Sequence, residues 1–339
     1  MRPVPLRWFR FYAGLSITAA CLWLTLRRVH LEEMARAAQH LQWHWFVLAL
    51  LALVAGYSAR IHRWWWMLRA YNPSVRLRSC AWPLLAGFAV NNVVPFRAGD
   101  ALRIVGFRKE LDTPAVRLLG SLLIERILDL SILLIFLLFG MTDLGARRLP
   151  IGYLHIAVLV AAVGTASWIC LLWMGNHLES LLLQICGARI WGAIGSAAAQ
   201  HVQNLFSTLS LVRAPRTAFK LLALSAVVWG LEGSVFAAAA AGLGYEGRSF
   251  GPWFALATGS LATMIPSSPG YVGTFDFFTV SGFTAYGTAT ASAVTMTLVI
   301  HLLLWLPITA AGLGYLVVVQ FKKRKEPVMP GPAQKQESL

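Results

Sequence analysis

The stretch WPLLAGFAVNNVVPFRAGDALR, residues 82–103, decides how the chain folds. It opens with an apolar run of about 12–15 residues, which is shorter than the ~20 residues that a helix needs to cross a bilayer. Two asparagines and Pro95 interrupt the run, and a second short run follows Gly99. Such an interruption is typical of a re-entrant hairpin made of two half-helices, and we predict one over residues 79–111.

A second segment, residues 250–285, has the same design. Its stretch WFALATGSLATMIPSSPG, residues 253–270, places Trp253, Pro266 and Gly270 at the spacings of the tryptophan, proline and glycine in the first stretch. Counting the spans between the two hairpins puts their entry points on opposite sides of the membrane. Two such segments indicate an inverted repeat, in which broken helices meet near the bilayer midplane and form a substrate site.

The whole chain has the composition of an all-α polytopic membrane protein. Of its 339 residues, 58% are hydrophobic and 13% are charged, whereas soluble domains carry about 25% charged residues. Windows of about 20 apolar residues predict six full spans in addition to the two re-entrant hairpins. These spans cover about residues 8–26, 43–68, 114–139, 152–174, 217–243 and 288–320.

The remaining segments complete the predicted organisation. Residues 176–212 are amphipathic, so they lie in the membrane interface or extend the next helix. Residues 1–321 form one integral membrane domain. Residues 322–339 form a basic, proline-rich cytoplasmic tail that we expect to be disordered.

The net charge of +15 is spread over the loops between the apolar runs rather than over one domain. This distribution argues against a nucleic-acid partner and for positive loops on the cytoplasmic side of a membrane. It predicts a multi-pass protein of a bacterial-type inner (plasma) membrane with both termini in the cytoplasm. His40 and His44 have a metal-like spacing, but no third ligand is evident, so we predict neither a metal nor a cofactor.

The span at about 114–139 carries a polar stripe. Arg117, Ser121, Glu125 and Asp129 follow one another at steps of four and share one helix face, and Arg126 can reach Asp129. A charged side chain at mid-bilayer costs about 2.5–3.5 kcal/mol, so the stripe needs a partner or a wet cavity. Both a structural ion pair and a polar cavity wall fit this pattern.

Two further polar residues lie inside spans. Glu232 is the one acid of its span, and it either serves function directly or pairs with an arginine such as Arg60, Arg63 or Arg126. His301 lies four residues after Thr297, and its setting favours a hydrogen-bonded packing histidine over a proton relay.

The first hairpin contains a candidate anion site. We expect Pro95 to end the first half-helix and Gly99 to permit the turn. Arg97 and Arg103 flank the start of the second half-helix, where an arginine fork would bind phosphate. Three polar neighbours join them: Asp100 either caps that helix or belongs to the site, and Asn91 and Asn92 satisfy unwound backbone or bind headgroup hydroxyls.

The second hairpin has a tight, polar turn followed by an acid. Asp276 stands on the returning half-helix, and we include it in the candidate site together with two turn serines. The turn consists of Pro266, Ser267, Ser268, Pro269, Gly270 and Gly273.

Three stretches, NNVVPFRAGDALR, ERILD and PSSPGYVGTFD, resemble the lysylphosphatidylglycerol synthase transmembrane region, a flippase-like family. Asp100 and Asp276 stand where the family has glutamate, and Tyr271 replaces a glycine. The resemblance implies a flippase-type membrane domain with re-entrant helices around a lipid-headgroup cavity. In the multidomain relatives a soluble aminoacyl-transfer domain follows this region, and we expect this chain to be a stand-alone member without that domain. The residues that match the family motifs are Asn91, Pro95, Arg97, Gly99, Arg103, Glu125, Arg126, Pro266, Pro269, Gly270 and Gly273.

These observations favour a lipid flippase or transporter that moves or binds an anionic headgroup, either a phospholipid or a polyprenyl-phosphate lipid. In this reading Glu125, Asp129 and Glu232 balance a cationic or hydroxylated headgroup or carry a proton. The first alternative is a non-transporting membrane partner of a glycosyltransferase or lipid synthase. The less favoured alternative is an intramembrane lipid transferase that uses Asp100 or Asp276, because no catalytic motif stands out.

Overall fold

The computed structural model describes residues 42–95, 97–145, 175–187, 192–247, 249–265 and 268–325, together with single residues within 16–24 and 155–168. The spans predicted at about 8–26 and 152–174 therefore lie largely outside the described residues, and so does most of the predicted tail.

Every regular element in the described part of the chain is a helix, which confirms the all-α fold. Three helices, α3, α10 and α13, are long and apolar enough to cross a membrane. The 30-residue helix α6 matches a fourth predicted span, although it carries the polar stripe. The bounds are α3 Trp43–Arg69, α4 Leu77–Val93, α5 Ala98–Ala101, η1 Leu102–Gly106, α6 Ala115–Leu144, α8 Gly175–Gly187, α9 Gly192–Leu209, η3 Ser210–Arg213, α10 Pro215–Gly242, α11 Gly251–Ala262, η4 Pro269–Tyr271, α12 Thr274–Ala285 and α13 Thr290–Lys325.

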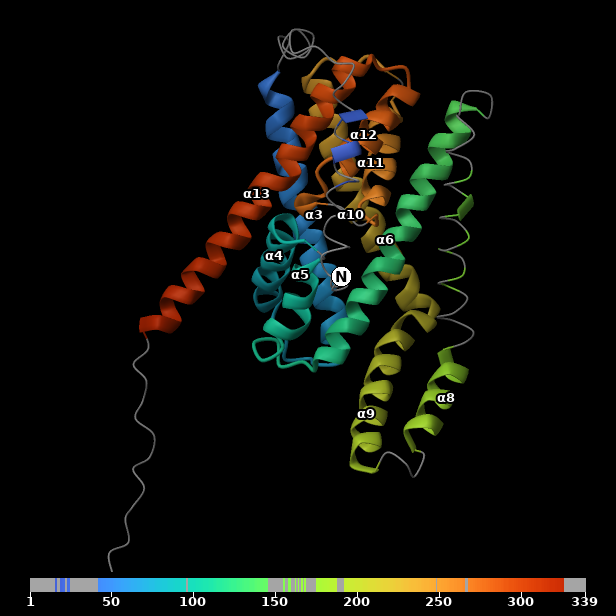
Figure 1. The fold of residues 1–339 in the computed structure, drawn as a ribbon, viewed down its shortest axis with the longest axis vertical. Helices are drawn as coiled ribbons and strands as arrows, with labels where there is room; N and C mark the ends of the chain where they lie inside the picture. The colour runs from blue at the N-terminus through green and yellow to red at the C-terminus, as the bar shows by residue number, and fades with distance from the viewer. Residues whose placement is uncertain are drawn as a thin grey trace, which may run out of the picture.

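The same order of elements occurs twice. A long helix (α3 or α10) precedes two short helices joined by a turn (α4 and α5, or α11 and α12), and a second long helix follows (α6 or α13). The short pairs coincide with the two predicted hairpins. In Figure 1, α4 and α5 lie in the lower half of the molecule and α11 and α12 in the upper half.

The two halves run in opposite directions. The N-terminal end of α3 meets the C-terminal end of α10, where the Gln42 amide donates to the Gly242 carbonyl at 3.0 Å. The turn of the second hairpin reaches the end of α4, because Gly270 of this turn lies beside the Asn92 carbonyl of α4. Trp305 of α13 donates its Nε1 hydrogen to the same carbonyl. An inverted repeat requires this antiparallel arrangement.

Each hairpin packs against the last helix of the other half. Gly312 of α13 lies so close to α4 that a methyl group there would overlap the Leu85 carbonyl, and Gly140 of α6 is equally close to the ring of Phe254 in α11. Two aromatic pairs lie across the same two helix contacts: Trp82 of α4 stacks on Tyr315 of α13, and Trp253 of α11 packs edge-on against Phe136 of α6. Small residues at such crossings allow close helix packing inside a membrane.

The sequence around Pro95 produces the first turn in a way that differs from our expectation. Val94 is extended, as a residue before proline should be, so α4 ends at Val93. The left-handed residue is Arg97, with φ of 54°, and not Gly99. Gly99 lies inside α5, where a methyl group would overlap the Gly87 carbonyl. Its role is close packing rather than backbone freedom.

The amphipathic stretch forms two separate helices, α8 and α9. Helix α9 packs on α6, where Thr208 touches Gly120 and Asn204 accepts hydrogen bonds from Arg117. Ala214 is extended before Pro215, so α9 and its short continuation η3 are distinct from α10.

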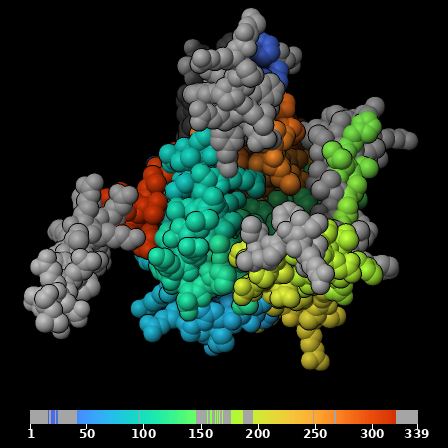
Figure 2. Space-filling model, turned by 60° about the horizontal axis from the view of Figure 1, so that its bottom comes forward, coloured from blue at the N-terminus to red at the C-terminus, as the bar shows by residue number. Residues whose placement is uncertain are grey.

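The end of the molecule that comes forward in Figure 2 carries residues of the first hairpin, between α3 and α6. The loops on either side of this hairpin contain Arg76, Arg108 and Lys109. Other basic residues lie over aromatic rings, as interface cations do: Arg69 over Trp65, and Lys220 over Trp66 at 4.2 Å. This end corresponds to the predicted cytoplasmic side.

Candidate functional site

The polar stripe of α6 faces the interior of the helix bundle. Ser121, Glu125 and Asp129 are all buried, and Ser121 accepts a hydrogen bond from Trp64 Nε1 at 3.1 Å. Arg117, at the start of the stripe, donates to Asn204 instead. The stripe therefore avoids lipid by docking against neighbouring helices.

Arg63 ties three long helices together. Its Nη1 atom donates to Asp129 Oδ1 of α6 and to Ser225 Oγ of α10, each at 2.6 Å. Trp229 Nε1 donates to the same Asp129 oxygen at 2.9 Å. The Arg63 side chain is only 1% exposed, and a buried arginine is stable when carboxylates and hydrogen bonds compensate it.

Arg103 is also buried and is held by Glu125. Its Nη2 lies 3.0 Å from Oε2 and its Nη1 lies 3.4 Å from Oε1, and the guanidinium sits 4.4 Å from the Trp64 ring centre. The structure thus does not bring Arg97 and Arg103 together as a fork. Glu125 neutralises Arg103, whereas Arg97 is half-buried and has no such partner among the described carboxylates.

Asp100 binds α6 rather than capping α5. Arg126 Nη2 donates to both Asp100 oxygens, at 3.1 and 3.2 Å. Asn91 donates to Asp100 at 3.0 Å, and its own Oδ1 accepts from the Gly99 amide at 2.8 Å. Arg126 does not pair with Asp129 as the i,i+3 spacing had suggested, because Asp129 points toward Arg63 on α3.

Asn92 anchors the last turn of α4 to α13. Its Nδ2 donates to Thr309 Oγ1 at 2.8 Å, and its carbonyl accepts from Trp305 at 3.2 Å. One end of the first hairpin is thereby fixed to the other half of the molecule.

Asp276 holds the second hairpin together. Its Oδ2 accepts the Gly273 amide at 2.8 Å, and its Oδ1 lies 2.6 Å from His301 Nδ1. His301 Nε2 lies 3.0 Å from the Gly270 carbonyl. Because a carbonyl can only accept, Nε2 carries a hydrogen, and the short contact to Asp276 needs one further proton between the two groups. With that shared proton, the His301–Asp276 pair has no net charge.

The turn of the second hairpin is built from residues with positive φ: Gly270, Tyr271 and Gly273. Ser268 Oγ donates to the Val272 carbonyl at 3.0 Å, so this serine stabilises the turn. Pro269 begins the short helix η4. The predicted Pro266 and Ser267 lie outside the described residues.

Glu232 pairs with Arg60, one of the three arginines expected from the sequence. The Arg60 guanidinium lies among the rings of Tyr57, Phe88 and Trp229, with centroid distances of 5.7, 5.8 and 4.9 Å. This aromatic surrounding and the carboxylate together compensate a buried cation.

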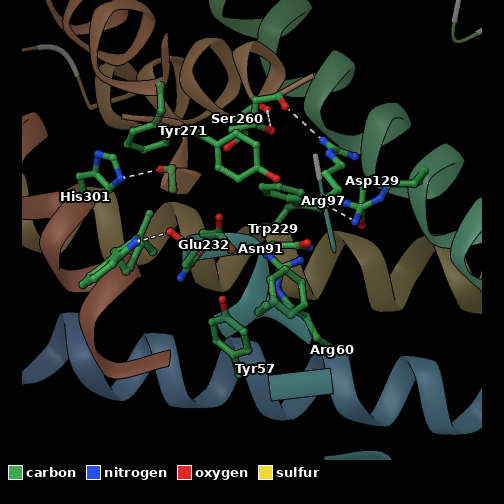
Figure 3. A pocket seen from close by; sticks show the side chains of 18 residues that line it. Tyr57, Arg60, Asn91, Arg97, Asp129, Trp229, Glu232, Ser260, Tyr271 and His301 are labelled. Atoms are coloured by element: carbon green, nitrogen blue, oxygen red, sulfur yellow. Dashed lines mark hydrogen bonds and ion pairs between the residues drawn. The ribbon is translucent and has the colours of Figure 1, made fainter. Parts of the chain in front are cut away.

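A cavity of about 150 Å³ lies between the two hairpins, and Figure 3 shows the side chains around it. It brings together six of the predicted site residues: Asn91, Asn92, Arg97, Arg126, Asp129 and Glu232. Five others hold partners or the turn and do not line it, namely Asp100, Arg103, Glu125, Ser268 and Asp276.

Arg97 is the exception among the arginines of this region. Its Nη2 donates to the Thr263 carbonyl at 3.2 Å, at the C-terminal end of α11. Among the described residues no carboxylate forms an ion pair with it, whereas Arg60, Arg63, Arg103 and Arg126 each have one. Arg97 therefore brings an uncompensated positive charge to the cavity.

The region that contains both hairpins also carries the family signature. Residues 11–312 match the model of the Lysylphosphatidylglycerol synthase TM region. The chain belongs to this family. No curated protein and no solved structure matches the chain. Membership and the apolar helices together place this family member in a membrane.

Several residues that line the cavity are missing from the site that the sequence predicts. His301 lines the cavity and holds Asp276, but an isolated histidine in an apolar span gave no sign of its partner 25 positions away. Arg60 was noted only as a partner of Glu232. Tyr57 and Ser260 look like ordinary helix residues in sequence, and only the fold shows that they face the cavity.

Within the described residues, no three His, Cys, Asp or Glu side chains are grouped in a way that could hold a metal ion.

Proposed function

We propose that the protein binds the anionic headgroup of a membrane lipid in the cavity between the two hairpins and moves it across the membrane. The observation that carries this proposal is Arg97, a cation at the tip of the first hairpin that pairs with none of the described carboxylates. A charge at mid-membrane needs compensation, and a bound phosphate would supply it.

The size of the cavity supports a headgroup rather than a whole lipid. Its volume of about 150 Å³ is below the ~300–1,000 Å³ of pockets that enclose drug-sized ligands. The acyl or prenyl chains would remain among the apolar helix surfaces, which include many exposed leucines and valines.

The repeated fold suggests how the headgroup would move. Arg97 reaches across to Thr263, so one hydrogen bond links the tips of the two hairpins. Rocking of one half against the other would break this link and expose the cavity to the opposite side. A bound phosphate would compete with Thr263 for Arg97 and thereby favour opening.

We place the protein in a bacterial-type inner membrane as a multi-pass protein with both termini in the cytoplasm, which the basic end of the molecule supports. We also keep a glycosyltransferase or lipid synthase as a candidate partner, because such an enzyme would make or consume the lipid.

The experiment reconstitutes the purified protein in liposomes and follows a fluorescent anionic phospholipid between leaflets by dithionite quenching. Arg97→Ala should slow the transfer about 10- to 100-fold, since a hydrogen bond to a charged group is worth about 1.5–3 kcal/mol. Arg97→Lys should retain part of the rate. Arg78→Ala removes an exposed arginine near the same hairpin and is the matched control.

Two results would redirect the proposal. Protein that is inert alone but moves lipid once a synthase is added would favour the partner role. A new lipid product in the mass spectrum would favour a transferase. Both oxygens of Asp100 and both of Asp276 are already engaged, so neither acid offers a free base.

A further inference from the structure

The charges around the cavity can be counted together with their partners. Arg60, Arg63, Arg103 and Arg126 are held by Glu232, Asp129, Glu125 and Asp100 respectively. The fifth acid, Asp276, lies 2.6 Å from His301 Nδ1, and one proton shared between these two atoms leaves the pair with no net charge, because Nε2 donates to the Gly270 carbonyl. Among the described residues around the cavity, these pairs leave one positive charge, on Arg97. One negative charge on the ligand would balance it.

The carboxylates around the cavity are already paired. Asp129 accepts from Arg63 and Trp229, and Glu232 is bound to Arg60. An ammonium group on the headgroup would find no unpaired acid here and would lie beside the Arg60 guanidinium. Like charges in such a setting repel strongly, because little water screens them.

Hydroxyl groups, by contrast, are available. No hydrogen bond from the Tyr57, Ser260 or Tyr271 hydroxyl to any described residue is present, although all three side chains line the cavity. Ser260 is 8% exposed, so burial without a ligand or water would leave it unsatisfied. In Figure 3, Tyr57 enters from α3 on one side, and Tyr271 and Ser260 enter on the opposite side.

We propose that the headgroup is a singly charged phosphodiester that carries a neutral, hydroxylated substituent such as glycerol or a sugar. Arg97 binds the phosphate, and the hydroxyls of Tyr57, Ser260 and Tyr271 contact those of the substituent. This inference rests on the proposed function. It disfavours headgroups with a free amine and doubly charged phosphomonoesters, because each departs from the single charge that the site balances.

The test compares four fluorescent lipids with identical chains: phosphatidylglycerol, phosphatidylmethanol, phosphatidylethanolamine and phosphatidic acid. Phosphatidylmethanol keeps the single charge and lacks the hydroxyls, so it isolates their contribution. Two quantities are measured, the transfer rate in liposomes and the lipid retained by purified protein in native mass spectrometry. Retention ranks the headgroups even in protein that does not transport.

We expect phosphatidylglycerol to rank first and phosphatidylmethanol to follow about 3- to 10-fold lower, the effect of one or two neutral hydrogen bonds. Tyr57→Phe and Ser260→Ala should reduce this difference and leave phosphatidylmethanol unchanged. Tyr315→Phe removes a hydroxyl that binds Glu110 at the surface, away from the cavity, and should change nothing.

Failure of the inference and failure of the proposed function give different results. The inference is wrong if phosphatidylglycerol and phosphatidylmethanol give equal retention and transfer, or if phosphatidylethanolamine or phosphatidic acid is preferred. The proposed function still holds in that case, provided that Arg97→Ala reduces retention and transfer. If the Arg97→Ala variant retains and transfers lipid as well as the wild type does, the proposed function is wrong. The phosphate site on which the inference rests is then wrong too.

Discussion

The two hairpins share a scaffold but differ in chemistry. Each has a tryptophan, a proline and a glycine at the same spacings, and in each the acid of the second limb is bound by a basic residue of the following long helix. Asp100 is bound by Arg126, a permanent cation, and Asp276 by His301. Two residues after the proline, the first tip carries Arg97, and the second carries Ser268.

In the proposed function, both halves of the repeat keep the same geometry, and only the first half would recognise the charge of the ligand. The first half contributes the three arginines that line the cavity, Arg60, Arg97 and Arg126, and Arg97 is the uncompensated cation among them. The second contributes a neutral His–Asp pair, a tight turn and the hydroxyl of Ser260. The phosphate would bind to the first half, and the second half would close around the rest of the headgroup.

The largest expected effect on stability comes from the ion pair between Glu125 and Arg103, which holds the first hairpin against α6. Glu125→Gln leaves Arg103 and part of the Arg63 environment uncompensated in the core. We expect the free energy of unfolding to fall by about 3–5 kcal/mol, the cost of breaking a buried ion pair. Denaturation in mixed detergent, followed by tryptophan fluorescence, measures it.

The matched control is Glu110→Gln, which changes an exposed acid and should cost little. In the second hairpin, Asp276→Asn should cost clearly less than Glu125→Gln, because asparagine can still accept from Gly273 and meet a neutral His301. Equal losses of unfolding free energy for Glu125→Gln and Asp276→Asn would contradict the contrast between the hairpins.

The next effect concerns how the first hairpin closes. Gly99→Ala forces a methyl group against the Gly87 carbonyl, and we expect a loss of about 1–3 kcal/mol from overpacking. The same denaturation assay measures it. Gly230→Ala, in a helix with open space at that position, is the control and should be neutral or slightly stabilising. A harmless Gly99→Ala would show that the two limbs are not packed as closely as described.

The smallest effect tests the charge count directly. Asp100→Asn frees Arg126, which lines the cavity, so the site should gain one positive charge and retain phosphatidylglycerol about 2- to 5-fold more strongly, the value of a partly exposed pair. Asp276→Asn should leave retention unchanged, because the His301 pair is neutral before and after the change. Native mass spectrometry of both variants measures the difference, and a gain from Asp276→Asn would refute a neutral pair.

Much of the fold follows from local sequence signals. The length of apolar runs and the prolines give α3, α6, α10 and α13 and locate both hairpins, because these signals act within a few residues. The pairing of charges does not follow in this way. Arg126 lies near Asp129 in sequence, yet it binds Asp100, since the rotation of α6 and its neighbours decides which side chains meet.

Only part of the candidate site could be predicted, because local sequence signals show which residues are polar but not which residues they contact. The sequence pointed to Arg97, Glu232 and the asparagines because charges and amides are conspicuous in apolar segments. It could not show that Glu125 neutralises Arg103, nor that His301 meets Asp276. Those contacts depend on helices that are far apart in the chain.

The central claim is that the first tip alone holds the anion, and one measurement tests it most directly. The transfer rate of labelled phosphatidylglycerol is measured in liposomes that contain wild-type protein, Arg97→Ala or Ser268→Ala at equal density. We predict at least a 10-fold loss of rate for Arg97→Ala and a near wild-type rate for Ser268→Ala. Equal rates for Arg97→Ala and the wild type would contradict it.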